Sequence, residues 1–101
     1  MPGRSAIAAF TRKLSREDAE TGSLLIEKSR WRMFPPPQEE FIVVVGDREF
    51  RTCIVAEECS CVTPLHQHYH LEAGHFRHLL DFRPAASVTI EKLPDGRYRV
   101  G

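Results

Sequence analysis

The segment FIVVVGDREFRTCIV, residues 41–55, decides the fold class of this chain. Its first five residues are aromatic or β-branched, which favours a strand. Gly46-Asp47 is a turn signal, and a second β-rich run follows from Glu49 to Val55. We therefore predict a β-hairpin over residues 41–55 and a structure that is mainly β.

The pattern repeats on both sides of this hairpin. Ser87 to Lys92 alternates polar and apolar residues, Pro94-Asp95-Gly96 supplies a turn, and Arg97 to Val100 alternates again. These residues predict a second hairpin at the end of the chain. Shorter strand signals are found at Ser23 to Ile26 and at Ala6 to Phe10.

Helical signals are few and short. The best are Ser29 to Phe34, which ends at a run of three prolines, and Ala73 to Leu80, whose apolar residues share one helical face. Many short strands with two brief helices set apart indicate a small barrel or a rolled antiparallel sheet. A βαβ fold would need strands and helices to alternate.

Length and charge restrict the classes of protein that fit. The chain has 101 residues, so we expect a single domain over residues 1–101. Its 14 Lys and Arg balance 14 Asp and Glu, so no overall field attracts polyanions, and any such site is local. The longest apolar run is too short for a membrane span, and three cysteines do not make a disulfide framework. We expect a soluble intracellular protein.

Five motifs follow one another in an order that a known family shares. Residues 12–18 read RKLSRED, residues 22–28 read GSLLIEK, and Phe34-Pro35 follows. Later, residues 70–76 read HLEAGHF, and residues 80–90 end in an alternating strand. This order resembles the B3-type DNA-binding domains of plant transcription factors and of bacterial restriction endonucleases. The resemblance implies a seven-stranded open pseudobarrel with two short helices.

The resemblance also implies that two arms grip the major groove of double-stranded DNA. The first arm maps to Thr11, Arg12, Lys13, Ser15 and Arg16, and the second to about Cys61 to Tyr69, where His66, Gln67, His68 and Tyr69 are the candidate contacts. The basic residues Lys28 and Arg30 complete the candidate set. Arg and Lys contact phosphates, Arg also reads guanine, and Gln reads adenine, so these residue types suit the task.

A cluster of potential metal ligands supports an alternative hypothesis. Five soft or borderline ligands lie within twelve residues, at Cys59, Cys61, His66, His68 and His70. Zinc binds such thiolates and imidazoles tetrahedrally, so the cluster suits a zinc-binding protein-interaction module. The spacing from His66 and His68 to Glu72 also fits part of a cupin-like metal site. Without zinc, no cofactor is expected.

No catalytic constellation is evident in the sequence. The adjacent carboxylates Glu17-Asp18 and Glu39-Glu40 would point in opposite directions on a strand, and a nuclease needs convergent acids. Cys53 is expected to be a small core residue within a strand, and Trp31 to pack a short helix on the barrel. We predict a non-catalytic DNA-binding domain of a restriction or regulatory system, with a nuclease or another protein as a second partner.

This hypothesis makes a geometric demand on the fold. The two arms must face each other across a space that admits a duplex and that acidic side chains do not fill. If about six phosphates are neutralised, log affinity should fall against log salt concentration with a slope of about −5.

Overall fold

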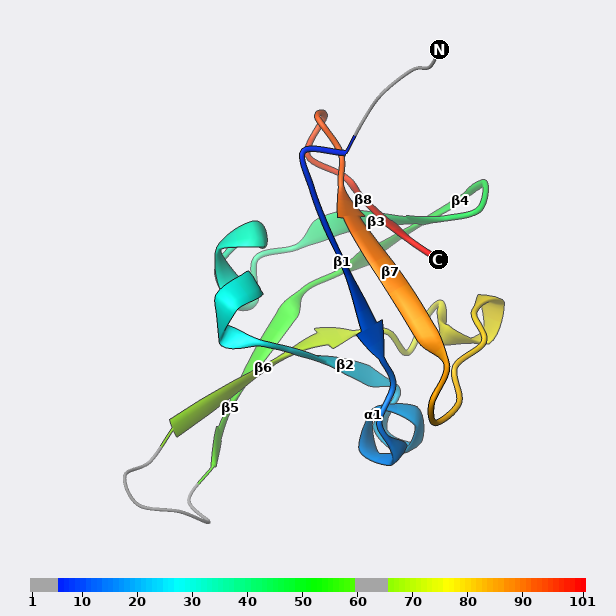
Figure 1. Cartoon of the computed structure of the whole chain (residues 1–101). Helices are drawn as coiled ribbons and strands as arrows, with labels where there is room; N and C mark the ends of the chain where they lie inside the picture. Colours follow the sequence, from blue (N-terminus) through cyan, green and yellow to red (C-terminus); the bar gives the residue numbers. More distant parts are fainter. Residues whose placement is uncertain (1–5, 60–65) are drawn as a thin grey trace.

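The computed structural model describes residues 6–59 and 66–101, and of residues 58, 59, 66 and 67 it describes the backbone alone. Eight strands in these ranges form two sheets (Figure 1). The larger sheet contains, in spatial order, β1 (Ala8–Lys13), β7 (Ser87–Lys92), β8 (Tyr98–Val100), β3 (Phe41–Val45) and β4 (Arg48–Thr52). The smaller contains β2 (Ser23–Ile26), β6 (His66–Glu72) and β5 (Ile54–Cys59).

The two predicted hairpins are both present in the larger sheet. β3 pairs antiparallel with β4 across the turn at Gly46-Asp47, and β7 pairs antiparallel with β8. The two hairpins join through the parallel pairing of β3 with β8, with Val43 opposite Tyr98. The mainly β, open pseudobarrel expected from the sequence is therefore confirmed, although the described residues form eight strands rather than seven.

The chain crosses from one sheet to the other at Cys53, so the prediction of one strand over Glu49 to Val55 is wrong. β4 ends at Thr52 and β5 begins at Ile54. The backbone and side-chain polar groups at the break are satisfied by β6, since Thr52 Oγ1 donates to the Glu72 carbonyl at 2.5 Å and Glu72 N donates to the Cys53 carbonyl at 3.2 Å. Cys53 is half-buried at this bend rather than a core residue within a strand.

The helices differ from those expected. The segment predicted at Ser29 to Phe34 is a 3₁₀ helix, η1 (Lys28–Met33), and of Ala73 to Leu80 only η2 (Arg77–Leu79) is helical. The one α-helix of the described residues, α1 (Arg16–Thr21), was not predicted as a helix. None of the helices of the described residues is long and apolar enough to cross a membrane.

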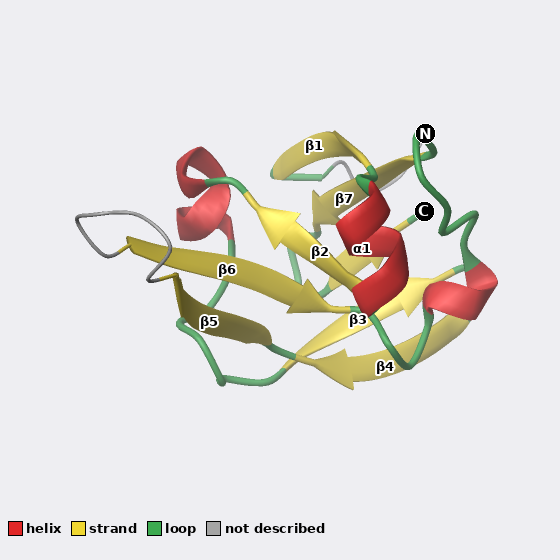
Figure 2. Ribbon diagram, turned by 90° about the horizontal axis from the view of Figure 1, so that it is seen from below, coloured by secondary structure: helices red, strands yellow, loops and turns green. Residues whose placement is uncertain are grey.

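The core fills the space between the two sheets. Leu24 and Leu71 of the smaller sheet and Val43 and Ile90 of the larger one are completely buried. Tyr98 is also buried, and its hydroxyl donates to the Met33 carbonyl at 2.6 Å, which fixes η1 to the larger sheet. This packing leaves the outer face of the smaller sheet, together with α1, as the part of the molecule that holds the candidate site (Figure 2).

Candidate functional site

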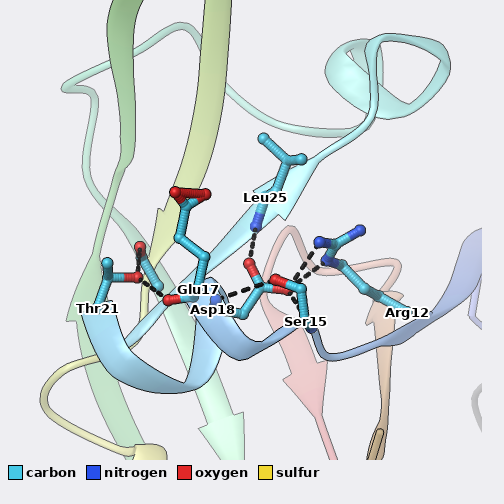
Figure 3. Close-up of polar contacts among 7 residues, drawn as sticks. Arg12, Ser15, Glu17, Asp18, Thr21 and Leu25 are labelled. Carbon is cyan, nitrogen blue, oxygen red and sulfur yellow. Dashed lines mark hydrogen bonds and ion pairs between the residues drawn. The ribbon is translucent and has the colours of Figure 1, made fainter. Parts of the chain in front are cut away.

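The first arm spans the end of β1 and the start of α1, and a buried carboxylate connects its parts (Figure 3). Arg12 of β1 donates from Nε and Nη2 to Asp18 Oδ2, at 2.9 and 2.7 Å. The backbone N–H of Ser15 donates to the same oxygen at 3.0 Å. The backbone N–H of Leu25 in β2 donates to Asp18 Oδ1 at 3.2 Å. The Asp18 side chain is only 4% exposed, so three segments of the chain converge on it.

The local sequence explains why α1 forms here. Ser15 is the N-cap, and its Oγ accepts from Asp18 N at 3.1 Å while Asp18 accepts from Ser15 N, which makes a capping box. Gly22 ends the helix in the left-handed conformation, with φ at 73°. A helix of six residues is not stable by itself, so its position depends on these contacts.

The hydrogen bonds around Asp18 also fix its charge state. Burial acts to raise the pKa of Asp18, but the hydrogen bonds from Ser15 N–H, Arg12 and Leu25 N–H more than offset it and lower the pKa below the ordinary value of 3.8. Asp18 is therefore ionised at neutral pH, and its charge is balanced by Arg12.

The predicted contacts of the first arm fall into two groups. Arg12 forms an ion pair with Asp18. The Thr11 Oγ1 hydroxyl is hydrogen-bonded at 2.9 Å to Thr89 Oγ1 of the neighbouring strand β7. Lys13 and Arg16 are exposed, and neither side chain has a hydrogen bond or ion pair with another described residue. Ser15 is exposed as well, although its hydroxyl caps α1. Within the first arm, Lys13 and Arg16 are therefore the cations available to bind a partner.

The second arm lies on the β5–β6 hairpin. Residues 60–65, which include Cys61, lie outside the described residues, and His66 and Gln67 are placed by their backbone alone, opposite Cys59 and Glu58. Tyr69 is half-buried and stacks on Trp31, with ring centroids 3.9 Å apart and planes 10° apart. The indole N–H of Trp31 donates to the Ile26 carbonyl at 2.9 Å, so Trp31 packs η1 on the barrel as predicted.

A hollow of about 330 Å³ separates α1 from the β5–β6 hairpin. Figure 2 shows α1 beside the smaller sheet. The lining of the hollow comes from α1, β2, β5 and β6, namely Glu17, Asp18, Thr21, Ser23, Leu25, Glu57, His68 and His70. His68 is a predicted DNA contact, whereas the predicted contacts of the first arm are not among these lining residues. Three of the lining residues are acids, and the expectation that acidic side chains do not fill the space between the arms stays a prediction.

Two histidines of β6 face this hollow beside one of the acids. His68 and His70 have ring centroids 6.4 Å apart, and His70 Nε2 lies 3.8 Å from Glu57 Oε1. His70 Nδ1 is buried and has no hydrogen-bond partner among the described residues. The described part of the chain contains no group of three potential metal ligands, while Cys61 and the side chains of Cys59 and His66 lie outside it. The zinc-binding and cupin-like alternatives therefore stay predictions.

The remaining predicted contacts, Lys28 and Arg30, lie on η1, at the other end of β2 from α1 (Figure 1). Both are exposed, and each lies over an aromatic ring. Lys28 Nζ is 6.0 Å from the Trp31 ring, and the Arg30 guanidinium carbon is 5.4 Å from the Phe10 ring. Neither residue is among those that line the hollow.

Comparison with known proteins gives an informative match among solved structures. No protein-family model matches the sequence, and no curated protein does. Among solved structures, the complex of Arabidopsis FUS3 with DNA matches with a TM-score of 0.69 and 13% sequence identity, over 90% of this chain and 92% of that chain. At this identity the match shows the fold. The resemblance to the B3-type domains is thus confirmed for the fold.

Proposed function

We propose that this domain binds double-stranded DNA and does not catalyse a reaction on it. The observation that supports the proposal is the fold, which nine-tenths of the chain shares with a protein solved in complex with DNA. The duplex would lie across the end of β1 and the start of α1, which carry the exposed cations of the first arm, and the β5–β6 hairpin, which carries the second. The grip of the two arms on the major groove is part of this proposal.

The free cations of the first arm suit a DNA contact. Lys13 and Arg16 extend into solvent from the end of β1 and the start of α1, on either side of the Ser15 cap. Lys binds phosphate as a point charge, and Arg binds phosphate or guanine with two parallel hydrogen bonds. Side chains without an internal partner lose no existing bond when they bind, so these two residues should contribute most.

The acids of the hollow weaken binding but do not cancel it. Asp18 is already balanced by Arg12, and Glu57 Oε1 lies 3.8 Å from His70 Nε2. Glu17 is the remaining acid, exposed in the first turn of α1 beside Arg16. We therefore expect modest affinity and a strong dependence on salt, because a few local cations supply the attraction.

Salt-dependent binding to a labelled mixed-sequence duplex tests the proposal. Lys13→Ala and Arg16→Ala should each make the slope of log affinity against log salt concentration shallower by about 0.9, the value for one phosphate contact. If Arg16 reads a base, its replacement should instead cost about 1–3 kcal/mol of binding free energy. Neither change should lower the free energy of unfolding, since both side chains are exposed.

Arg99→Ala is the matched control for these variants. It also removes one arginine charge, but Arg99 lies in β8 of the larger sheet and pairs with Glu91 at 3.3 Å, outside both arms. Its salt slope should equal that of the parent protein. Equal slopes for all the variants, or no binding to the duplex at low salt, would contradict the proposal. A nuclease or another protein as a second partner stays a prediction.

A further inference from the structure

We infer that Asp18 is a positioning residue of the first arm, and that Arg12 is its partner rather than a contact to DNA. This inference rests on the proposed function. The sequence pattern groups Arg12 with Lys13 and Arg16 as one basic arm, but the structure separates them. Arg12 has a carboxylate partner at 2.7 Å and is 16% exposed, whereas the other two side chains are exposed and have no partner among the described residues.

The first step of the argument is that both oxygens of Asp18 are occupied. Oδ2 accepts from Arg12 and from Ser15 N, and Oδ1 accepts from Leu25 N. A buried carboxylate with this many donors has a fixed position, because any movement leaves a charge or an N–H group without a partner. Asp18 therefore links β1, the start of α1 and β2 at one point.

The second step is that the exposed cations lie on either side of this point. Lys13 follows Arg12 in β1, and Arg16 follows the Ser15 cap. Leu14, which follows Lys13, is buried and hydrogen-bonded to the loop before β7. Leu14 N donates to the Ala86 carbonyl at 2.7 Å, and Ala85 N donates to the Leu14 carbonyl at 2.9 Å. The network thus fixes the backbone positions from which these two charged side chains extend before DNA arrives, which lowers the backbone entropy lost on binding.

The third step is electrostatic. Arg12 directs Nε and Nη2 at Asp18 and is only 16% exposed, and withdrawing it toward a phosphate would leave a buried carboxylate without its counter-charge. Asp18 and Arg12 together contribute no net charge to the arm. A pair of this kind affects DNA binding through the shape of the arm and not through its charge.

The variant Asp18→Asn distinguishes the two roles by the sign of its effect. If Arg12 were a DNA contact held back by Asp18, the variant would free a cation and remove an anion, so duplex binding would become tighter. If Asp18 positions the arm, binding should weaken by roughly tenfold, the factor that one charge-assisted hydrogen bond supplies. Binding should be measured well below the melting temperature, where circular dichroism shows that both proteins are folded.

Two further variants keep this test independent of charge and of stability. The double variant Arg12→Gln with Asp18→Asn has the parent's net charge, so it should weaken binding while its salt slope stays unchanged. Glu91→Gln is the matched control, because it also removes a carboxylate paired with an arginine, in the larger sheet, and it should not weaken binding. Tighter or unchanged binding by Asp18→Asn would overturn the inference, as would a shallower salt slope for the double variant.

Hydrogen exchange on the free protein separates failure of this inference from failure of the proposed function. In Asp18→Asn, the amides of Ser15 and Leu25 should exchange faster than in the parent, while amides of the β3–β4 hairpin keep their protection. If the parent does not bind the duplex, the proposed function fails whatever the exchange shows. If the parent binds and these two amides keep their protection, Asp18 does not position the arm.

Discussion

Asp18 is the residue on which the stability of the first arm depends most directly. Its side chain is 4% exposed and ionised, a combination that proteins tolerate only where hydrogen bonds replace water. Here the backbone of Ser15, the Arg12 guanidinium and the backbone of Leu25 supply them. Because these bonds favour the charged form, the pKa of Asp18 lies below the 3.8 of an unfolded chain, despite the opposing effect of burial.

The lowered pKa predicts how stability depends on pH. Ionised Asp18 stabilises the folded state above pH 3.8, and this contribution is lost as pH falls through the lower pKa of the folded state. Asp18→Asn should therefore reduce the free energy of unfolding by about 1.5–3 kcal/mol at neutral pH, and the difference from the parent should shrink in acid. Urea titrations at a series of pH values measure it. A difference that stays constant down to the most acidic pH would contradict this account.

Sequence reasoning predicted the first arm but did not separate the roles of its residues. Arg12, Lys13 and Arg16 are equivalent in a one-dimensional pattern, since all three are basic and close together. The distinction arises because Asp18 is brought under β1 by a helical turn, and that turn was not predicted. The hollow could not be predicted from the sequence either. Glu17 and Glu57 are 40 residues apart in the sequence, and both line the hollow only because α1 packs beside the smaller sheet.

At the scale of elements, strands were easier to predict than helices. Ser87–Lys92 has the predicted bounds because its alternation of polar and apolar residues is a local signal, and Ser23–Ile26 has them because it is a short apolar run directly after Gly22. α1 has no apolar face long enough to show helical periodicity, and its signal is the Ser15 to Asp18 capping box and the glycine that follows. The break at Cys53 was missed because the sequence on both sides of it favours strand, and only the separation of the sheets requires a bend.

The C-terminal end of α1 gives a prediction at this scale. Gly22 has φ at +73°, and a Cβ there would lie 3.0 Å from Arg77 Nη1, whose side chain donates to the Ala19 carbonyl at 3.3 Å. Gly22→Ala should lower the free energy of unfolding by about 1–2 kcal/mol, because an L-residue is strained in the left-handed region. Thermal unfolding with circular dichroism measures this loss.

Gly74→Ala is the control for that variant. A Cβ at Gly74 would meet only Glu72 Oε1, at an ordinary distance of 3.8 Å. Its stability should stay within about 0.5 kcal/mol of the parent, as for most surface substitutions. Equal losses from the two alanine variants would show that the left-handed end of α1 does not determine the effect.

At the scale of the whole molecule, the net charge of zero is the sum of local regions of opposite charge. The first arm and η1 carry exposed cations, whereas the hollow between α1 and the β5–β6 hairpin carries Glu17 and Glu57. If the proposed function holds, a duplex across both arms would bring its phosphates close to these acids, whose repulsion would offset part of the attraction of Lys13 and Arg16.

This division of charge predicts a gain of binding by substitution. Glu17→Gln and Glu57→Gln should each strengthen binding to a mixed-sequence duplex by roughly two- to fivefold at low salt, and the gain should fade as salt screens the repulsion. Fluorescence anisotropy at a series of salt concentrations measures both effects. Glu39→Gln is the control, because Glu39 is exposed in the loop before β3 and does not line the hollow. If all three variants bind like the parent, the hollow does not face the duplex, and DNA must approach the arms from another side.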